Sequence, residues 1–226
     1  MSGGIKSDGS WSNWAGNQRS RQVRIEYPTS ETEVVDLVQR AASDDLRVRV
    51  VGAGHSFTSI ARTNDVLVSL DGLTGIESLD DATGRVRVRA GTRLSDLNPQ
   101  LDGLSLAMPN LGDVAYQSVA GAISTSTHGT GLGFQSIAAG VVGLRLVAGD
   151  GSVVVLDDDH DPELRDVARV GLGALGILTE VTLQCVPAFN LHAIEEILPV
   201  DQVLSSFDEW ASSTDHVEFF WMPHTG

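Results

Sequence analysis

A glycine-rich turn directly after an alternating strand constrains this chain more than any other feature. Residues 46–50 alternate between apolar and arginine side chains, which predicts a half-buried strand. The strand leads into Gly52-Ala53-Gly54-His55-Ser56, where two glycines stand one residue apart. Glycines allow a backbone to approach a bulky anion closely and to present bare N–H groups to it. We therefore expect an anion-binding turn here, and a phosphorylated ligand that His55 contacts or bonds to.

Charge and composition exclude several classes of partner. The 226 residues carry a formal net charge of −15, which argues against nucleic acid and against an anionic membrane surface. Cys185 is the only cysteine, so an internal disulfide is impossible, as expected in a reducing compartment. The sequence has no signal-peptide core near its N-terminus and no run of roughly 20 apolar residues that could span a membrane. The expected location is therefore the cytoplasm.

The spacing of apolar residues predicts a mixed α+β architecture. Ser30 and Glu33 have the spacing of a capping box, and an apolar helical stripe follows them. Helices are expected over residues 31–41, 94–101, 162–170 and 201–211. Strands are expected over residues 46–51, 66–70, 76–79, 85–90, 140–148, 152–156, 177–186, 191–198 and 216–222. Gly149-Asp150-Gly151 predicts a hairpin turn.

Changes in composition divide the chain into three parts. Residues 1–16 are rich in glycine and serine, and we expect a loose lead-in that Trp11 and Trp14 anchor. Residues 17–187 are expected to form the main domain, and residues 188–226 the beginning of a second one. The acidic residues 157–161 are interpreted as a solvated turn before a helix, with a metal site as the less favoured alternative.

Two further glycine-rich segments strengthen the expectation of a ligand site. In residues 118–131, small hydroxyl residues alternate with glycine and alanine, which suits a ligand lying flat along the backbone. Residues 171–177 form the third segment. The first two segments match neither G-x-G-x-x-G nor G-x-x-x-x-G-K-[ST], so their spacing excludes the Rossmann and P-loop types of site. The alternative interpretation is that the three segments are ordinary glycine-rich loops. The occurrence of three such segments in one chain disfavours this alternative.

Short motifs recur in a fixed order from residue 14 to about residue 187. They are Trp14-Ala15-Gly16-Asn17, Gly52-Ala53-Gly54-His55-Ser56-Phe57, Pro109-Asn110-Leu111-Gly112, Ser118-Val119-Ala120-Gly121, Thr127-His128-Gly129-Thr130-Gly131 and Gly173-Ala174-Leu175-Gly176-Ile177. In series they resemble flavoproteins of the vanillyl-alcohol-oxidase type, specifically the sugar-lactone and alditol oxidases. The resemblance implies a PCMH-type FAD-binding domain of two α+β subdomains with the cofactor between them.

The resemblance also assigns contacts by position. The first segment would wrap the pyrophosphate, the second would hold the cofactor, and the backbone of Ile177 would contact the flavin. The expected cofactor residues are Val50, Val51, Gly52, Ala53, Gly54, His55, Ser56, Ser118, Gly121, Thr125, Ser126, Thr127, His128 and Ile177. Gly112 and Asp113 match positions near the reactive face of the flavin. Alditol oxidases carry serine at the second of these positions, so Asp113 favours a lactone-oxidising relative.

His55 matches the histidine that many family members link covalently to the flavin 8α carbon. A neutral imidazole nitrogen can attack this carbon, and the ordinary histidine pKa of about 6.5 leaves that form available near neutral pH. The alternative is a hydrogen bond from His55 to a noncovalent flavin. His128, inside a tight loop, is interpreted as a structural hydrogen-bonding residue. The arginines at 47, 49, 85, 87, 89 and 93 are expected mainly on solvated strand faces, with one or two offsetting cofactor charge.

The resemblance implies oxidation of a carbinol of a sugar 1,4-lactone or alditol by hydride transfer to flavin N5, with dioxygen or another acceptor reoxidising the flavin. The family's histidine-tryptophan-x-lysine-like motif, which belongs to the substrate domain, is absent from this sequence. We therefore expect a C-terminally truncated chain with a nearly complete cofactor domain. The alternative is a noncatalytic or split FAD-binding fragment whose partner chain supplies the substrate domain. An NADPH-dependent reductase of the same fold is less favoured, because residues 118–131 and 173–177 match the carbohydrate oxidases better.

Overall fold

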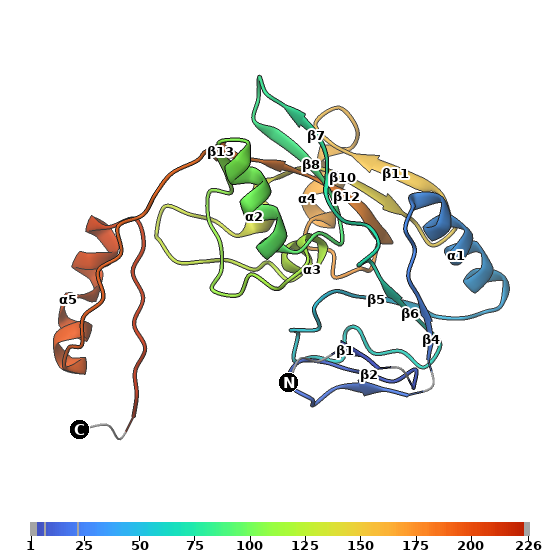
Figure 1. Ribbon diagram of the computed structural model, residues 1–226, viewed down its shortest axis with the longest axis horizontal. Helices are drawn as coiled ribbons and strands as arrows, with labels where there is room; N and C mark the ends of the chain where they lie inside the picture. The colour runs from blue at the N-terminus through green and yellow to red at the C-terminus, as the bar shows by residue number, and fades with distance from the viewer. Residues whose placement is uncertain (1–3, 7, 22, 224–226) are drawn as a thin grey trace.

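Two sheets of different kinds carry the structure, a computed structural model that describes residues 4–6, 8–21 and 23–223 (Figure 1). The first sheet is parallel and has the strand order β4 (Arg24–Glu26), β6 (Val66–Ser69), β5 (Val48–Val51). The second is antiparallel and has the order β11 (Val153–Leu156), β10 (Val141–Val147), β12 (Ile177–Gln184), β8 (Arg85–Arg89), β7 (Ile76–Asp80). Together with the helices beside them, these sheets confirm the predicted α+β class.

The helix α1 (Glu31–Ser43) packs against the parallel sheet. Ser30 is its N-cap, and the hydroxyl of Ser30 accepts a hydrogen bond from the N–H of Glu33 at 3.2 Å, as the capping-box spacing predicts. The buried side chains of the helix recur at helical spacing and join the strand valines in one cluster: Val34, Leu37, Val38 and Ala41. Because β5 is an edge strand, one side of its backbone faces away from β6.

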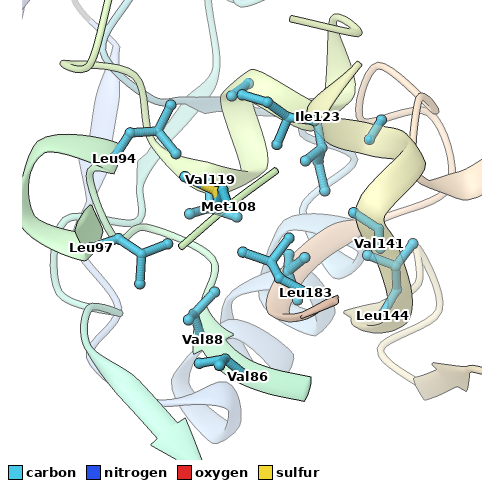
Figure 2. Packing of buried hydrophobic residues seen from close by; sticks show 14 of the residues in the cluster. Val86, Val88, Leu94, Leu97, Met108, Val119, Ile123, Val141, Leu144 and Leu183 are labelled. Atoms are coloured by element: carbon cyan, nitrogen blue, oxygen red, sulfur yellow. The ribbon is translucent and has the colours of Figure 1, made fainter. Parts of the chain in front are cut away.

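The largest core lies on one face of the antiparallel sheet. Val86 and Val88 of β8 are fully buried, whereas the arginines that alternate with them lie on the opposite face and pair with acidic side chains. Figure 2 shows the β8 valines and Leu183 of β12 converging with apolar side chains of two helices. The helices beside this sheet are α2 (Leu94–Gly103), α3 (Val119–Ser124) and α4 (Pro162–Ala168). The 3₁₀ turn η1 (Ile137–Gly140) and the pair β9 (Leu106–Ala107) with β13 (Val186–Pro187) complete this half.

The N-terminal segment is more ordered than the sequence predicts. Its strands β1 (Gly4–Ile5), β2 (Trp11–Ser12) and β3 (Arg19–Ser20) form a small antiparallel sheet beneath β5 and β6 (Figure 1). Trp11 is 3% exposed and packs with Val51 and Leu67, whereas Trp14 is 52% exposed. The expectation of a loose N-terminal segment is therefore wrong, because β2 pairs with β3 across the proposed boundary after residue 16. The domain boundaries themselves stay predictions.

Three element predictions differ from the structure. Residues 191–198 and 216–222 form no strand, although α5 (Val200–Ser213) between them is confirmed. Their alternating pattern is typical of a strand, but neither segment lies along a sheet edge that could pair with it. The third difference is α3, which occupies part of the second glycine-rich segment, where the sequence predicts no helix. In the described part of the chain, no helix is long and apolar enough to cross a membrane.

A polar network joins α1 to the antiparallel sheet. The Arg145 guanidinium donates from Nε and Nη2 to the two oxygens of Glu31, at 2.7 and 2.8 Å. The Thr179 hydroxyl donates to Glu31 Oε2 at 2.8 Å, from a position where the β10–β12 register shifts by one residue. The hydrogen bonds from Arg145 have the largest effect on the pKa of the Glu31 carboxyl and lower it below its ordinary 4.5. Burial opposes this shift, and the hydrogen bond from Thr179 adds a smaller lowering of the pKa. This network links α1, which packs on the parallel sheet, to β10 and β12 of the antiparallel sheet.

We expect Glu31→Gln to lower the free energy of unfolding by about 1–2 kcal/mol at neutral pH, because the Arg145 guanidinium loses its carboxylate partner. The folded-state pKa of Glu31 lies below the unfolded one. The stabilisation is therefore complete above about pH 4.5 and is lost as the pH falls through the folded pKa. Urea denaturation at several pH values measures both effects. Glu77→Gln is the matched control, because Glu77 and Arg89 have similar exposure but the pair has no third partner. If Glu31→Gln and Glu77→Gln lowered the free energy of unfolding equally, the stabilising role assigned to the Glu31 network would be contradicted.

Candidate functional site

A cavity of about 730 Å³ opens between the two sheets. The loop after β5 and the C-terminal half of α1 form one wall, while α3, the end of β10 and the start of β12 form the other. This volume lies within the range of roughly 300–1,000 Å³ typical of ligand pockets. The three glycine-rich segments singled out in the sequence all contribute residues to its lining. The fold therefore brings together segments that lie more than a hundred residues apart.

The loop after β5 presents a run of free backbone donors. Among the described residues, no acceptor receives a hydrogen bond from the backbone N–H groups of residues 52–57. All six of these residues line the cavity. The loop is partly open to solvent, and consecutive backbone N–H groups without a protein partner can form an anion-binding concavity. The loop is thus chemically suited to an oxyanion such as a phosphate or pyrophosphate.

Two glycines allow the walls of the cavity to approach each other. A Cβ atom at Gly52 would lie 2.4 Å from Ser118 Oγ, the hydroxyl that caps α3 by accepting from the Gly121 N–H at 3.2 Å. A Cβ atom at Gly176 would lie 2.3 Å from the Val147 carbonyl oxygen, and this glycine has φ +148°. Side chains at these two positions would occupy the space in which the segments meet.

The cavity carries little uncompensated charge, although the whole chain is strongly acidic. Of the described residues that line it, only Arg49, His55 and Asp71 have ionisable side chains. Asp71 is paired with Arg93. Arg49 is exposed, and none of the described carboxylates pairs with it. An anionic ligand therefore meets backbone donors and one free cation here, instead of the negative charge that covers much of the rest of the chain.

His55 lies on the cavity wall with both ring nitrogens free of hydrogen-bond partners among the described residues. Its ring stacks on the indole of Trp14, with centroids 5.9 Å apart and an angle of 21° between the planes. Trp14 does not line the cavity. Sequence reasoning missed this contact, since it treated the tryptophans as anchors of a lead-in. The only available signal was the occurrence of Trp14 in a family motif.

Most of the predicted cofactor residues meet at this cavity. Those in its lining are Val50, Val51, Gly52, Ala53, Gly54, His55, Ser56, Ser118, Gly121, Thr125 and Ile177. Ser126, Thr127 and His128 lie outside it. The Thr127 hydroxyl accepts from Gln117 Nε2 at 3.1 Å, and His128 Nδ1 lies 3.0 Å from the Gly129 carbonyl oxygen. The side chains of Thr127 and His128 thus make contacts within the loop, and the backbone N–H of Ser126 donates to the Ile123 carbonyl at 3.0 Å.

Gly112 and Asp113 also lie outside the cavity, on the loop between β9 and α3. A Cβ atom at Gly112 would lie 3.1 Å from the His128 carbonyl oxygen, so this loop packs against the segment at residues 127–128. Asp113 is exposed. The structure thus brings the second glycine-rich segment and the Gly112 loop together beside the cavity.

Several lining residues carry no sequence signal of a ligand site. Ala41 and Ala42 lie in the last turn of α1, and Leu46 lies on the loop that follows it. Ala148 and Gly149 come directly after β10. Small apolar residues on a helix face are typical of an ordinary core. They line the cavity because the α1 end and the β10 end diverge there, which depends on the tertiary arrangement.

Comparison with known proteins identifies the family to which this chain is similar. Residues 24–157 match the family model described as FAD binding domain, and residues 181–226 match the model described as D-arabinono-1,4-lactone oxidase. The chain is 45% identical over 214 residues to L-gulono-1,4-lactone dehydrogenase of Mycobacterium tuberculosis, covering 95% of this chain and 49% of the relative. It is 36% identical to D-arabinono-1,4-lactone oxidase of Eremothecium gossypii, covering 98% and 42%. The chain thus spans about half the length of the curated relatives it matches.

Solved structures share the fold at low sequence identity. Cholesterol oxidase from Brevibacterium sterolicum superposes with a TM-score of 0.70 at 22% identity, covering 79% of this chain and 37% of the other. A solvent-stable cholesterol oxidase superposes with a TM-score of 0.69 at 24% identity. At such identities the likeness establishes the shared fold.

Proposed function

The chain belongs to the FAD-binding-domain family, and we propose that its cavity holds FAD for the oxidation of a sugar 1,4-lactone. The observation that carries the proposal is the run of free backbone N–H groups at residues 52–57 along the cavity wall. These groups bind the pyrophosphate, and the Arg49 guanidinium supplies a positive charge beside them. The close contact between Gly52 and Ser118 keeps side chains out of the space that the pyrophosphate takes.

The remaining cofactor contacts follow the lining of the cavity. Ser118, Gly121 and Thr125 bind FAD from the side of α3, and the Ile177 backbone contacts the flavin from the third glycine-rich segment. The loop that supports this wall contains Ser126, Thr127 and His128. These three residues are assigned to cofactor binding on the family resemblance alone. The cofactor domain spans residues 17–187, and residues 188–226 begin the substrate domain.

His55 is the residue that we assign as the covalent tether of the flavin. Its ring nitrogens are free of other partners and it faces the cavity. A bond between one of these nitrogens and the flavin 8α carbon would remove one proton from each atom and two electrons in all, which dioxygen would accept to give hydrogen peroxide. The cell compartment that suits this chain, with its lone buried thiol, is the cytoplasm.

When bound, FAD accepts a hydride from the substrate carbinol and passes the electrons to dioxygen or another acceptor. The chain's own residues orient the cofactor and exclude water from one face of it. Gly112 and Asp113 are proposed to lie near the reactive face, because their loop packs against residues 127–128 beside the cavity. Lactones are favoured over alditols as substrates, since the curated relatives named above act on lactones.

A second candidate is an FAD-binding chain that turns over only with further polypeptide. Large apolar side chains near α5 face solvent and favour this candidate, because their burial by another polypeptide would be stabilising. They include Leu191, Ile194, Ile197, Leu204, Phe220 and Trp221. The further polypeptide would supply the substrate domain.

Anaerobic addition of L-gulono-1,4-lactone and D-arabinono-1,4-lactone to the FAD-loaded chain distinguishes the two candidates. The lactone-oxidising assignment predicts that the visible flavin absorbance bleaches with a lactone, and returns when air is admitted. A polyol such as xylitol serves as the matched non-lactone ligand. Bound flavin that no lactone and no polyol can bleach would contradict turnover by this chain, and would support the second candidate.

A further inference from the structure

The N-terminal segment holds the His55 loop on both sides of the histidine. The backbone N–H of Trp14 donates to the Gly54 carbonyl at 2.8 Å. The side-chain amide of Asn13 donates to the Ser56 carbonyl at 2.9 Å, and that of Asn17 donates to the Phe57 carbonyl at 3.1 Å. With a further bond from Gln18 Nε2 to the Phe57 carbonyl at 3.4 Å, four hydrogen bonds from a segment about 40 residues earlier in the chain reach the carbonyls before and after His55. The carbonyl groups of Gly54, Ser56 and Phe57 are bound here, whereas the N–H groups of the loop have no partner among the described residues.

The side chain of Asn13 anchors this segment from within. Asn13 is buried, its Nδ2 also donates to Asn17 Oδ1 at 2.6 Å, and its Oδ1 accepts from the Gln18 N–H at 3.0 Å. A buried amide with all these partners is costly to displace. The segment is therefore a rigid support for the loop.

The indole of Trp14 reaches from this support to the imidazole. It stacks on His55 and meets the Phe57 ring edge-on, with centroids 6.3 Å apart and an interplanar angle of 89°. The indole of Trp14 is not part of the hydrophobic core, because it is half exposed and lies outside the buried cluster that contains Trp11. It is also outside the cavity lining. What it contacts is the ring proposed to bond the cofactor.

We propose that Trp14 is a positioning residue for the covalent attachment of the flavin to His55. This inference rests on the proposed tether. Stacking restricts the imidazole to a narrow set of ring orientations, so that one nitrogen is directed into the cavity when FAD occupies it. Misplacing a reacting group by about 1 Å can cost on the order of a hundredfold in rate. Trp14 thus acts on the rate of bond formation and leaves FAD affinity unchanged.

The test measures how fast acid-stable flavin appears after cofactor-free chain is mixed with FAD in aerated buffer. Trp14→Leu is expected to slow this rate by about tenfold or more, whereas Trp14→Phe keeps an aromatic ring and retains most of the rate. Trp221→Leu removes another exposed indole and is the matched control, with no change expected. For every variant, flavin fluorescence quenching gives the FAD affinity and a thermal melt gives the Tm. Both are expected to match those of the unchanged chain.

The outcomes separate this inference from the proposed tether. Absence of acid-stable flavin in the unchanged chain would overturn both. Equal rates for Trp14→Leu and the unchanged chain, with the tether lost in His55→Ala, would overturn the positioning role alone. The positioning role would also be overturned if Trp14→Leu and Trp14→Phe both lowered the FAD affinity or the Tm in parallel with the rate of attachment. That result would show that Trp14 has a general structural role.

Discussion

Replacing His55 with alanine is expected to abolish acid-stable flavin while FAD still binds. In the proposed site, the pyrophosphate is bound by the backbone N–H groups of residues 52–57, which line the cavity and which the substitution leaves in place. Only the nucleophilic ring is removed. After acid precipitation, the unchanged chain should give a yellow, fluorescent pellet. The His55→Ala chain should give a colourless pellet and a yellow supernatant.

His128→Ala is the matched control for this experiment. His128 lies outside the cavity, on the loop that supports its wall, and its ring bonds a neighbouring carbonyl. Its loss should leave the pellet yellow. A yellow pellet from His55→Ala would show that another residue carries the flavin. A colourless pellet from the unchanged chain, with FAD in the supernatant, would show that the cofactor is noncovalent.

A methyl group at Gly52 is expected to weaken FAD binding by about tenfold or more, which corresponds to about 1.4 kcal/mol. The added Cβ would lie 2.4 Å from Ser118 Oγ, so either the Ser118 hydroxyl must rotate or the loop must move away from α3. Rotation breaks the cap of α3, and movement displaces the N–H groups from the pyrophosphate. Titration of cofactor-free protein with FAD, followed by flavin fluorescence, measures the loss.

A double variant separates this contact from other effects of Gly52→Ala. Ser118→Ala removes the hydroxyl that the new methyl group meets, at a cost of about 1 kcal/mol in helix capping. Gly52→Ala combined with Ser118→Ala should therefore bind FAD more tightly than the sum of the single effects predicts. Gly133→Ala is the control, because a Cβ atom there would meet no other atom within 4 Å. Additive losses would contradict the role assigned to the Gly52–Ser118 contact.

Local signals were sufficient to predict most elements of the cofactor domain. The capping box at Ser30 and the apolar stripe of α1 are properties of one segment, and the structure confirms both. The strand predicted at residues 191–198 failed for a non-local reason. Alternating residues indicate a two-faced segment, but pairing needs a neighbouring edge that this segment does not have. α3 was missed because its glycine and small residues have weak helical signals, and tertiary burial of Val119 and Ile123 stabilises it.

The residues of the candidate site also divide into those with a local sequence signal and those that depend on the tertiary structure. The glycine spacing at residues 50–56 was enough to single out a segment that lines the cavity, because that spacing is a property of the local backbone, and the anion site itself stays a prediction. Ala41 and Ala148 could not be assigned, since they become neighbours of a ligand only where the two sheets meet. The stack of Trp14 on His55 likewise depends on the N-terminal sheet, whose two-residue strands left no periodic pattern to detect.

The central claim is that the free N–H groups of residues 52–57 bind the pyrophosphate of FAD. The most direct measurement is calorimetric titration of the His55→Ala chain, in which binding is reversible, with FAD and then with riboflavin. FAD should saturate one site per chain, and riboflavin, which lacks the pyrophosphate and the adenosine attached to it, should bind about a hundredfold more weakly. Equal affinities for FAD and riboflavin, or no saturable binding of FAD, would contradict the claim.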